Sequence, residues 1–268
     1  MIRLENVSLK FPGGITAIHP TSLDFQAGQF TVLLGASGAG KSSLIRCLNL
    51  LHRPTTGAIL VEGLGKLDQF RIVRRHRRQT AMIFQQHQLI GRHTAWKNVL
   101  LGRLAYYSTW RSLLPLPHGD QVLALECLER VGLLNKALER VDALSGGEQQ
   151  RVGIARALAQ QPRLILADEP VASLDPANSQ KILDLLQDIC KKDGITAIVS
   201  LHQVELALAY ADRIVALAKG RIVFDGSPAE LNPARLEAIY QAGASLVADR
   251  FAKPEAQWAS LNLAAMEE

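Results

Sequence analysis

The chain has 268 residues, of which 48% are hydrophobic and 21% are charged. This length and composition are sufficient for one α/β domain with a sizeable core and an inserted subdomain, and they exclude a disordered or fibrous protein. The formal net charge of +5 suits an acidic partner such as a nucleotide, a nucleic acid or an anionic membrane face, without choosing among them.

The N-terminal segment carries charges at Arg3, Glu5 and Lys10, where a signal peptide needs its apolar stretch. No uncharged apolar run in the sequence approaches the roughly 18 residues of a membrane-spanning helix. We therefore expect a cytoplasmic protein that meets a membrane only through a partner. Three cysteines lie far apart in apolar helical patterns without a CxxC pair, which predicts core thiols. They are Cys47, Cys127 and Cys190.

Short apolar or β-branched runs alternate with stretches of helical spacing, which indicates a mainly parallel sheet covered by helices. The predicted strands span residues 30–34, 81–84, 164–167, 196–200 and 213–217. Apolar residues at i, i+3, i+4 and i+7 mark the buried face of one helix, with Ile182, Leu185, Leu186 and Ile189. Lys219 and Gly220 separate two apolar runs and predict a hairpin near the edge of the sheet.

The segment from about residue 88 to residue 142 differs from its surroundings. It is richer in leucine at helical spacing and is interrupted by Pro115, Pro117 and Gly119. We interpret it as a helical subdomain inserted into a domain that spans residues 1–240. Residues 241–268 are too few for a further domain and are expected to form a short C-terminal tail.

A glycine-rich loop follows the predicted strand at 30–34 and precedes a stretch of helical spacing. It fits the pattern GxxxxGK[ST] with Gly35, Ala36, Ser37, Gly38, Ala39, Gly40, Lys41 and Ser42. Such a loop turns its backbone N–H groups toward a polyphosphate, and the following helix adds its positive N-terminal end. The pattern therefore predicts an ATP site, in which Lys41 reaches the β and γ phosphates, Ser42 holds Mg²⁺ and Ser43 lies beside them.

A Mg²⁺ site needs a second anchor, and an apolar strand that ends in two carboxylates offers one. Asp168 directly follows the run 164–167 and is predicted to hold Mg²⁺. Glu169, the next residue, is predicted to accept a proton from the water that attacks the γ phosphate. Any strand that is followed by a polar loop can end in two carboxylates. The pair at 168–169 therefore indicates a Mg²⁺ site only together with the glycine-rich loop.

The segment 144–151 reads Leu-Ser-Gly-Gly-Glu-Gln-Gln-Arg and opens a further predicted helix. Ser145 and Glu148 have the S-x-x-E spacing of a capping box, which closes the N-terminus of a helix. A capped helix that presents Ser145 with the amides of Gly146 and Gly147 is also suited to bind an anion. The two interpretations are compatible.

Together, the loop at 35–42, the segment 144–151 and the carboxylate pair at 168–169 resemble the motifs of ABC transporter ATPases. The resemblance implies the ABC ATPase fold, an α/β fold with a P-loop NTPase core and mainly parallel sheet, an antiparallel β subdomain and an inserted α-helical subdomain. It also implies a homodimer in which Ser145, Gly146, Gly147 and Glu148 of one copy face the γ phosphate bound by the other. Many members carry glutamine in place of Glu148, and active members with glutamate also occur.

Four further residues take their roles from this resemblance alone. Phe11 resembles the aromatic residue that stacks on adenine, and Asp175 the carboxylate of the loop that crosses the dimer interface. Gln85 resembles the glutamine that senses Mg²⁺ and the attacking water, and His202 the switch histidine that contacts the γ phosphate. The catalytic set is then Glu169, His202 and Gln85, and the Mg²⁺ set is Ser42, Gln85 and Asp168.

Within this family, the chain looks most like the ATP-binding subunits of phosphonate importers. The likeness rests on the segments 83–86, 169–176, 193–196 and 213–217, and on Gln203 after His202, where many importer subunits have aspartate. It implies ATP and Mg²⁺ as cofactors, integral-membrane permease subunits, and a periplasmic or extracellular substrate-binding protein that is reached through the permease. The expected location is peripheral, on the cytoplasmic face of the cell (inner) membrane.

Other interpretations stay open. The arginine-rich segment 71–78 fits a nucleic-acid patch, a solvated helix face or a surface for anionic lipid headgroups; we favour the solvated face and expect no direct nucleic-acid partner. A soluble ABC-type ATPase that assists a phosphonate-degrading complex or a nucleic-acid process is one rival. Another is an adaptor that binds ATP to dimerise without turnover, which the complete set of Asp168, Glu169 and His202 disfavours.

Overall fold

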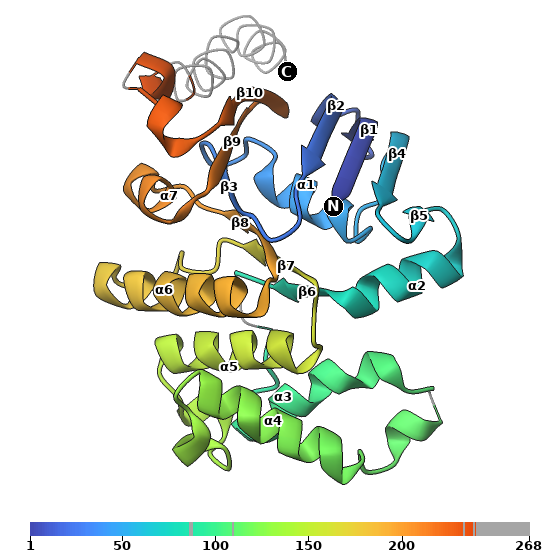
Figure 1. Cartoon of the computed structure of the whole chain (residues 1–268), viewed down its shortest axis with the longest axis vertical. Helices are drawn as coiled ribbons and strands as arrows, with labels where there is room; N and C mark the ends of the chain where they lie inside the picture. Colours follow the sequence, from blue (N-terminus) through green and yellow to red (C-terminus); the bar gives the residue numbers. More distant parts are fainter. Residues whose placement is uncertain (86–87, 109, 233, 238, 240–268) are drawn as a thin grey trace, which may run out of the picture.

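The computed structural model describes residues 1–85, 88–108, 110–232, 234–237 and 239. In this part of the chain, two sheets and a set of helices build one α/β assembly (Figure 1). The C-terminal tail predicted at 241–268 and Gln86 of the segment 83–86 lie outside the described residues.

Strands and helices alternate along most of the chain. The strands are β1 (Ile2–Lys10), β2 (Thr16–Phe25), β3 (Phe30–Leu34), β4 (Thr56–Val61), β5 (Gly65–Lys66), β6 (Thr80–Ile83), β7 (Leu164–Asp168), β8 (Thr196–Ser200), β9 (Arg213–Ala218) and β10 (Arg221–Gly226). The α-helices are α1 (Lys41–Leu48), α2 (Phe70–Gln79), α3 (Ala95–Leu100), α4 (His118–Arg130), α5 (Gly146–Ala159), α6 (Pro176–Asp193) and α7 (Val204–Tyr210). Short 3₁₀ turns are η1 (Leu101–Tyr106), η2 (Arg111–Leu113), η3 (Leu134–Lys136), η4 (Val141–Ala143) and η5 (Pro228–Glu230).

A six-stranded sheet with the order β10-β9-β3-β8-β7-β6 forms the centre of the molecule (Figure 1). The strands β9, β3, β8, β7 and β6 run parallel, and β10 returns antiparallel after Lys219 and Gly220. The mainly parallel sheet and the edge hairpin are thus confirmed, and the strand predicted at 81–84 begins and ends one residue earlier. Because parallel strands end at the same edge of a sheet, the residues that follow β3, β6, β7 and β8 gather there.

The helix α1 lies between this sheet and a smaller antiparallel sheet with the order β2-β1-β4-β5. Its Leu44 and Leu48 share one apolar cluster with Phe25 of β2 and Leu33 of β3. Side chains alternate along a strand, so the neighbouring Val32 belongs to the cluster on the other face of the large sheet. The antiparallel β subdomain that the resemblance implied is therefore present and is packed on α1.

Helices from the second half of the chain cover that other face. Ile182, Leu186 and Ile189 of α6 are buried there and Leu185 is partly buried, which confirms the predicted helix face. The three cysteines are buried and form no disulfide, as expected of core thiols. Among the described residues, no helix combines the length and the apolarity that crossing a membrane requires.

Between β6 and β7 the described chain forms a helical region with α3, α4 and four 3₁₀ turns before α5. The region packs closely on α5, since a Cβ added at Gly102 in η1 would lie 2.3 Å from the carbonyl oxygen of Arg156. Arg103 donates to the carbonyl oxygen of Ala159 at 3.1 Å, and the Tyr106 hydroxyl donates to that of Gln160 at 2.8 Å. The boundaries of the inserted subdomain and of the domain at 1–240 stay predictions.

The arginine-rich segment forms α2 and binds backbone groups on both sides. Arg77 donates to the carbonyl oxygens of Asn49 at 3.1 Å and Leu50 at 2.7 Å, just after α1. Arg78 donates to the carbonyl oxygen of Tyr106 at 3.0 Å and lies 4.8 Å from the centroid of its ring. These two arginines therefore join the end of α1 to the helical region.

Candidate functional site

The glycine-rich loop at 35–42, called the P-loop below, lies between β3 and α1 and is confined by both sheets. Gly35 has φ 148°, and a Cβ there would lie 2.3 Å from the carbonyl oxygen of Leu217 in β9. Gly40 has φ 107°, and its Cβ would lie 2.7 Å from the carbonyl oxygen of Ala17 in β2. Only glycine fits these two positions, because both the backbone conformation and the space exclude a side chain.

Lys41 is 3% exposed and folds back over the P-loop. Its Nζ donates to the carbonyl oxygens of Gly35 at 2.8 Å and Ala36 at 3.0 Å. The same Nζ lies 3.9 Å from Oε1 of Glu169. Burial lowers the pKa of Lys41, while the charges of Glu169 and Asp168 act in the opposite direction. The loop thus holds the ammonium group of Lys41 between its own carbonyl oxygens and the carboxylate of Glu169.

Asp168 and Glu169 stand where β7 ends, beside the end of β8. Asp168 is 3% exposed; its Oδ1 accepts from the Ser200 hydroxyl at 3.3 Å, and its Oδ2 lies 3.3 Å from the guanidinium of Arg46. Glu169 has φ 49°, a conformation that non-glycine residues seldom adopt, and its N–H donates to Ser200 Oγ at 2.8 Å. The two carboxylates therefore have different neighbours: Asp168 is held by α1 and β8, and Glu169 approaches Lys41.

The oxygen donors at this site suit Mg²⁺ bound together with phosphate. Within the described ranges, no group of three or more His, Cys, Asp or Glu side chains could hold a metal ion by itself. One buried carboxylate, Asp168, and the hydroxyl of Ser42 at the start of α1 are available instead. Mg²⁺ prefers oxygen ligands and commonly combines one or two protein groups with substrate phosphates and water, so these residues fit it.

Sequence reasoning missed Arg46 and Ser200. Both contact Asp168 through tertiary structure, since Ser200 pairs with Asp168 in the register of β7 and β8, and Arg46 reaches it from α1. The sequence does show that Ser200 is a hydroxyl residue at the end of an apolar strand. The residues around Ser200 and Arg46 do not indicate that either one lies next to β7.

Gln85 and His202 are both exposed and both start from the sheet edge that carries Asp168. Gln85 follows β6 in a bend, and His202 follows β8 just before α7. Because β6 and β8 flank β7, the sheet order places both residues beside the carboxylates. Their catalytic roles stay predictions.

Phe11 follows β1 and is partly buried against the apolar cluster that contains Ala39 of the P-loop. Its ring meets the ring of His52 edge-on, with 5.3 Å between the centroids. These contacts place the ring of Phe11 beside His52, in the segment that follows α1. Stacking on adenine stays a prediction for this ring.

The segment 144–151, called the signature segment below, forms the predicted capping box at the start of α5. The N–H of Glu148 donates to Ser145 Oγ at 3.4 Å, and Oε2 of Glu148 accepts from the N–H of Ser145 at 2.9 Å and from its hydroxyl at 2.8 Å. Oε1 of Glu148 lies 2.6 Å from Nζ of Lys136. The bond from Lys136, followed by those from Ser145, lowers the pKa of Glu148 to about 2.

Asp175 lies beside the signature segment. It caps α6 by accepting from the N–H of Asn178 at 3.0 Å and from its Nδ2 at 2.6 Å, and these bonds lower the pKa of Asp175. A Cβ added at Gly147 would lie 3.9 Å from Asn178, which shows how near the two helix starts are. The predicted residues thus form two groups, one around Lys41 at the sheet edge and one around Ser145 at the start of α5.

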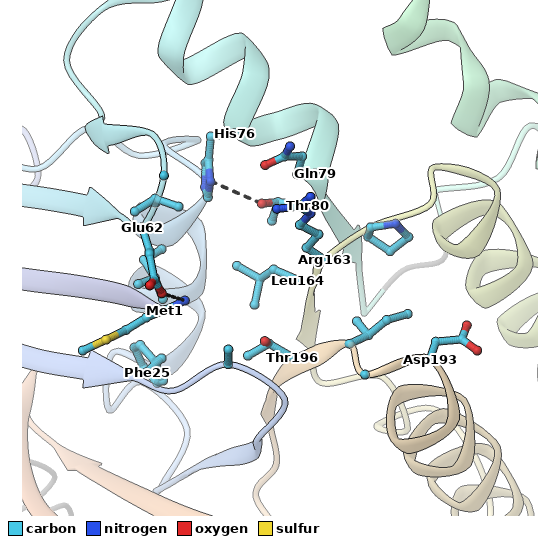
Figure 2. A pocket seen from close by; sticks show the side chains of 17 residues that line it. Met1, Phe25, Glu62, His76, Gln79, Thr80, Arg163, Leu164, Asp193 and Thr196 are labelled. Carbon is cyan, nitrogen blue, oxygen red and sulfur yellow. Dashed lines mark hydrogen bonds and ion pairs between the residues drawn. The ribbon is translucent and has the colours of Figure 1, made fainter.

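A cavity of about 530 Å³ opens at the opposite edge of the large sheet (Figure 2). Thr80, Leu164 and Thr196, the first residues of β6, β7 and β8, line it, and His76 of α2 bonds to Thr80 there through Nδ1 at 3.4 Å. Ligands of parallel sheets bind beyond the carboxyl ends of the strands. This cavity lies at the amino ends and is therefore not part of the site around the P-loop.

Comparison with known proteins gives a consistent result. The family model described as ABC transporter matches residues 18–172. The chain is 63% identical over 240 residues to the phosphonates import ATP-binding protein PhnC 3 of Nostoc sp., covering 90% of this chain and 92% of that protein. It is also 63% identical over 240 residues to the phosphite import ATP-binding protein PxtA of Stutzerimonas stutzeri, covering 90% and 87%.

Solved structures show the same fold. A dimeric ATP-binding cassette in a post-hydrolysis state, bound to ADP and Pi, is 33% identical with a TM-score of 0.75, covering 85% of this chain and 99% of that one. The cbiO1 protein of Clostridium perfringens, part of an ABC transporter complex, is 27% identical with a TM-score of 0.76, covering 85% and 89%. With a family model that matches more than half of its length and relatives this similar, the chain belongs to the ABC transporter family.

Proposed function

We propose that this chain is the ATP-binding and ATP-hydrolysing subunit of an ABC import complex that takes up phosphonate or a related phosphorus oxyanion. The observation that carries the proposal is the meeting of Lys41 with Glu169 and Asp168 beside a P-loop that only glycine allows. This arrangement combines a cation for the phosphates with carboxylates for Mg²⁺ and water.

The cargo class is supported by relatives and not by the site. Two proteins of equal identity, 63%, are named for phosphonates and for phosphite. Both compounds are phosphorus oxyanions, so we propose this chemical class and not one member. Permease subunits and a substrate-binding protein would contact the cargo, while this chain lies peripherally at the cytoplasmic face of the membrane.

The positions of the side chains support ATP hydrolysis at this site. The P-loop amides and Lys41 bind the β and γ phosphates, and Ser42, Gln85 and Asp168 would hold Mg²⁺, which when bound offsets the negative charge of the phosphates. Glu169 approaches Lys41 to 3.9 Å, which supports a position beside the γ phosphate, where its carboxylate would accept a proton from the attacking water. His202 contacts the γ phosphate from the same edge of the sheet.

Two copies complete each site. The signature segment and Asp175 form their own group in the single chain, and we propose that Ser145, Gly146, Gly147 and Glu148 meet the nucleotide held by the other copy while Phe11 stacks on its adenine. A cassette of the same fold has been solved as a dimer, which supports this arrangement. Closing and reopening of the pair would move the helical region, and Gln85 lies where the sheet joins it.

Replacement of Glu169 tests the catalytic proposal. Glu169→Gln keeps the shape of the side chain but removes the base, so we expect phosphate release to slow by about 10²-fold or more while ATP binding is kept. Glu129→Gln, a change on an exposed part of α4, serves as the matched control. Unchanged phosphate release in Glu169→Gln would remove this residue from its role, and no release from the unaltered protein would favour the adaptor.

Purification from membranes tests the assembly. We expect the tagged chain, recovered from detergent-solubilised membranes, to bring an integral-membrane permease with it. Recovery of the chain with soluble enzymes and without a permease would favour the soluble ATPase instead.

A further inference from the structure

Glu148 puts a carboxylate into the segment that is proposed to receive a phosphate anion. Its Oε2 lies 2.8 Å from the hydroxyl of Ser145, the residue at the very start of α5. A helix N-terminus attracts anions with only about half of a positive charge. A carboxylate so near Ser145 carries a full negative charge. Unless a cation neutralises it, it would repel a phosphate that approaches Ser145.

Lys136 supplies the opposite charge. It ends the 3₁₀ turn η3, and its Nζ lies 2.6 Å from Oε1 of Glu148. The two side chains are 32% and 17% exposed, so the pair is shielded by solvent less than a fully exposed ion pair. The contact raises the pKa of Lys136 and lowers that of Glu148, which fits a pair with both members charged.

The pair is not needed to make the cap. Glu148 accepts both bonds from Ser145 through Oε2, whereas Lys136 contacts Oε1. Two other cations near the segment contact other groups: Arg130 pairs with Asp193 at 2.6 Å, and Arg151 donates to the carbonyl oxygen of Val131 at 3.4 Å. What Lys136 adds to the capping box is therefore charge, not hydrogen bonds to Ser145.

We propose that Lys136 is a positioning residue of the composite ATP site, which neutralises Glu148 so that Ser145 and the start of α5 can accept the γ phosphate bound by the other copy. This inference rests on the proposed function, because it requires the signature segment to meet a nucleotide across the dimer. It goes beyond that function by assigning a role to a residue of the helical region outside the motifs.

A double-mutant cycle tests the proposal with dimer formation as the readout. The parent is the Glu169→Gln protein, titrated with MgATP and followed by sedimentation velocity. We expect Lys136→Met to raise the half-saturating MgATP concentration by about tenfold, the size of effect that one partly shielded charge can give. In the Glu148→Gln background, which lacks the carboxylate, the same change should raise it less than about twofold.

Two further variants separate charge from structure. Lys136→Arg keeps the positive charge and should stay within about threefold of the parent, because a guanidinium also pairs with a carboxylate. Lys192→Met removes a lysine from an exposed pair with Asp188 on α6 and should leave dimer formation unchanged. Thermal unfolding of each variant confirms that it is folded before titration.

The outcomes discriminate between the two levels of the proposal. An equal rise with and without the Glu148 carboxylate, or no rise in either background, overturns the role of Lys136. Failure of the parent itself to dimerise in saturating MgATP, while it still binds a fluorescent ATP analogue, overturns the composite site and hence the proposed function.

Discussion

Lys41 is a buried cation that the P-loop holds in place. Its ammonium is buried among carbonyl oxygens of the P-loop and faces two carboxylates, so it remains close to charges of opposite sign although burial lowers its pKa. A polyphosphate would offer this ammonium bonds in which both partners are charged, and these are stronger than its bonds to neutral carbonyl groups.

Replacement of this lysine should weaken nucleotide binding itself. Hydrogen bonds to charged groups contribute about 1.5–3 kcal/mol each, so we expect Lys41→Ala to weaken binding by about 10- to 100-fold. Titration of a fluorescent ATP analogue measures this directly. Lys191→Ala, at an exposed position in the last turn of α6, is the control for loss of a lysine. Equal affinity of Lys41→Ala and the control would contradict the site.

At the scale of elements, the contact between η1 and α5 fixes the helical region against the core. Gly102 lies so near α5 that an added Cβ would meet the carbonyl oxygen of Arg156 at 2.3 Å and the Cβ of Ala159 at 3.3 Å. Hydrogen bonds from Arg103 and Tyr106 reach the same end of α5. The close approach of the η1 and α5 backbones, and not a sequence motif, therefore fixes the position of the helical region relative to α5.

Two glycines of this region should respond to alanine in opposite ways. Gly102→Ala must push η1 away from α5, and we expect a loss of about 2 kcal/mol in the free energy of unfolding. Gly119→Ala lies in the first turn of α4 with open space around its Cβ, so it should be neutral or stabilising by at most about 1 kcal/mol. Urea denaturation of both variants measures the difference. Equal stabilities would contradict the close packing of η1 on α5.

At the scale of the whole molecule, the predicted residues divide into a group at the sheet edge and a group at the start of α5. The first group has the P-loop, Asp168 and Glu169, and the second has the signature segment and Asp175. Under the proposed function, the two groups meet between copies. Each copy would then need the partner subunit to hydrolyse ATP.

Mixing of two inactive variants tests whether each active site is shared between two copies. Lys41→Ala damages the first group and Ser145→Arg the second, so neither variant should hydrolyse ATP alone. A mixed dimer contains one site with both defects and one intact site, and an equal mixture should recover up to about a quarter of normal phosphate release. Absence of recovery in dimers shown to be mixed would contradict a site shared between copies.

The sequence by itself determined the local structure of this protein. Several local features could be predicted, because each depends on spacing and backbone preference within a few residues. They are the P-loop, the strands around it, the helix face at 182–189, the edge hairpin and the capping box. The motif resemblance also identified the family, since its residues stand in a fixed order along the chain.

Only the tertiary structure decided which of these parts touch. The contacts of Ser200 and Arg46 with Asp168, of Lys41 with Glu169, and of Lys136 with Glu148 join segments that are separated along the chain. The periodicity of apolar residues predicts which residues are buried. The order of the strands in the sheet and the contact of η1 with α5 depend instead on packing over the whole chain. Packing over the whole chain, and not a local sequence pattern, therefore brings Asp168 and Glu169 close to Lys41.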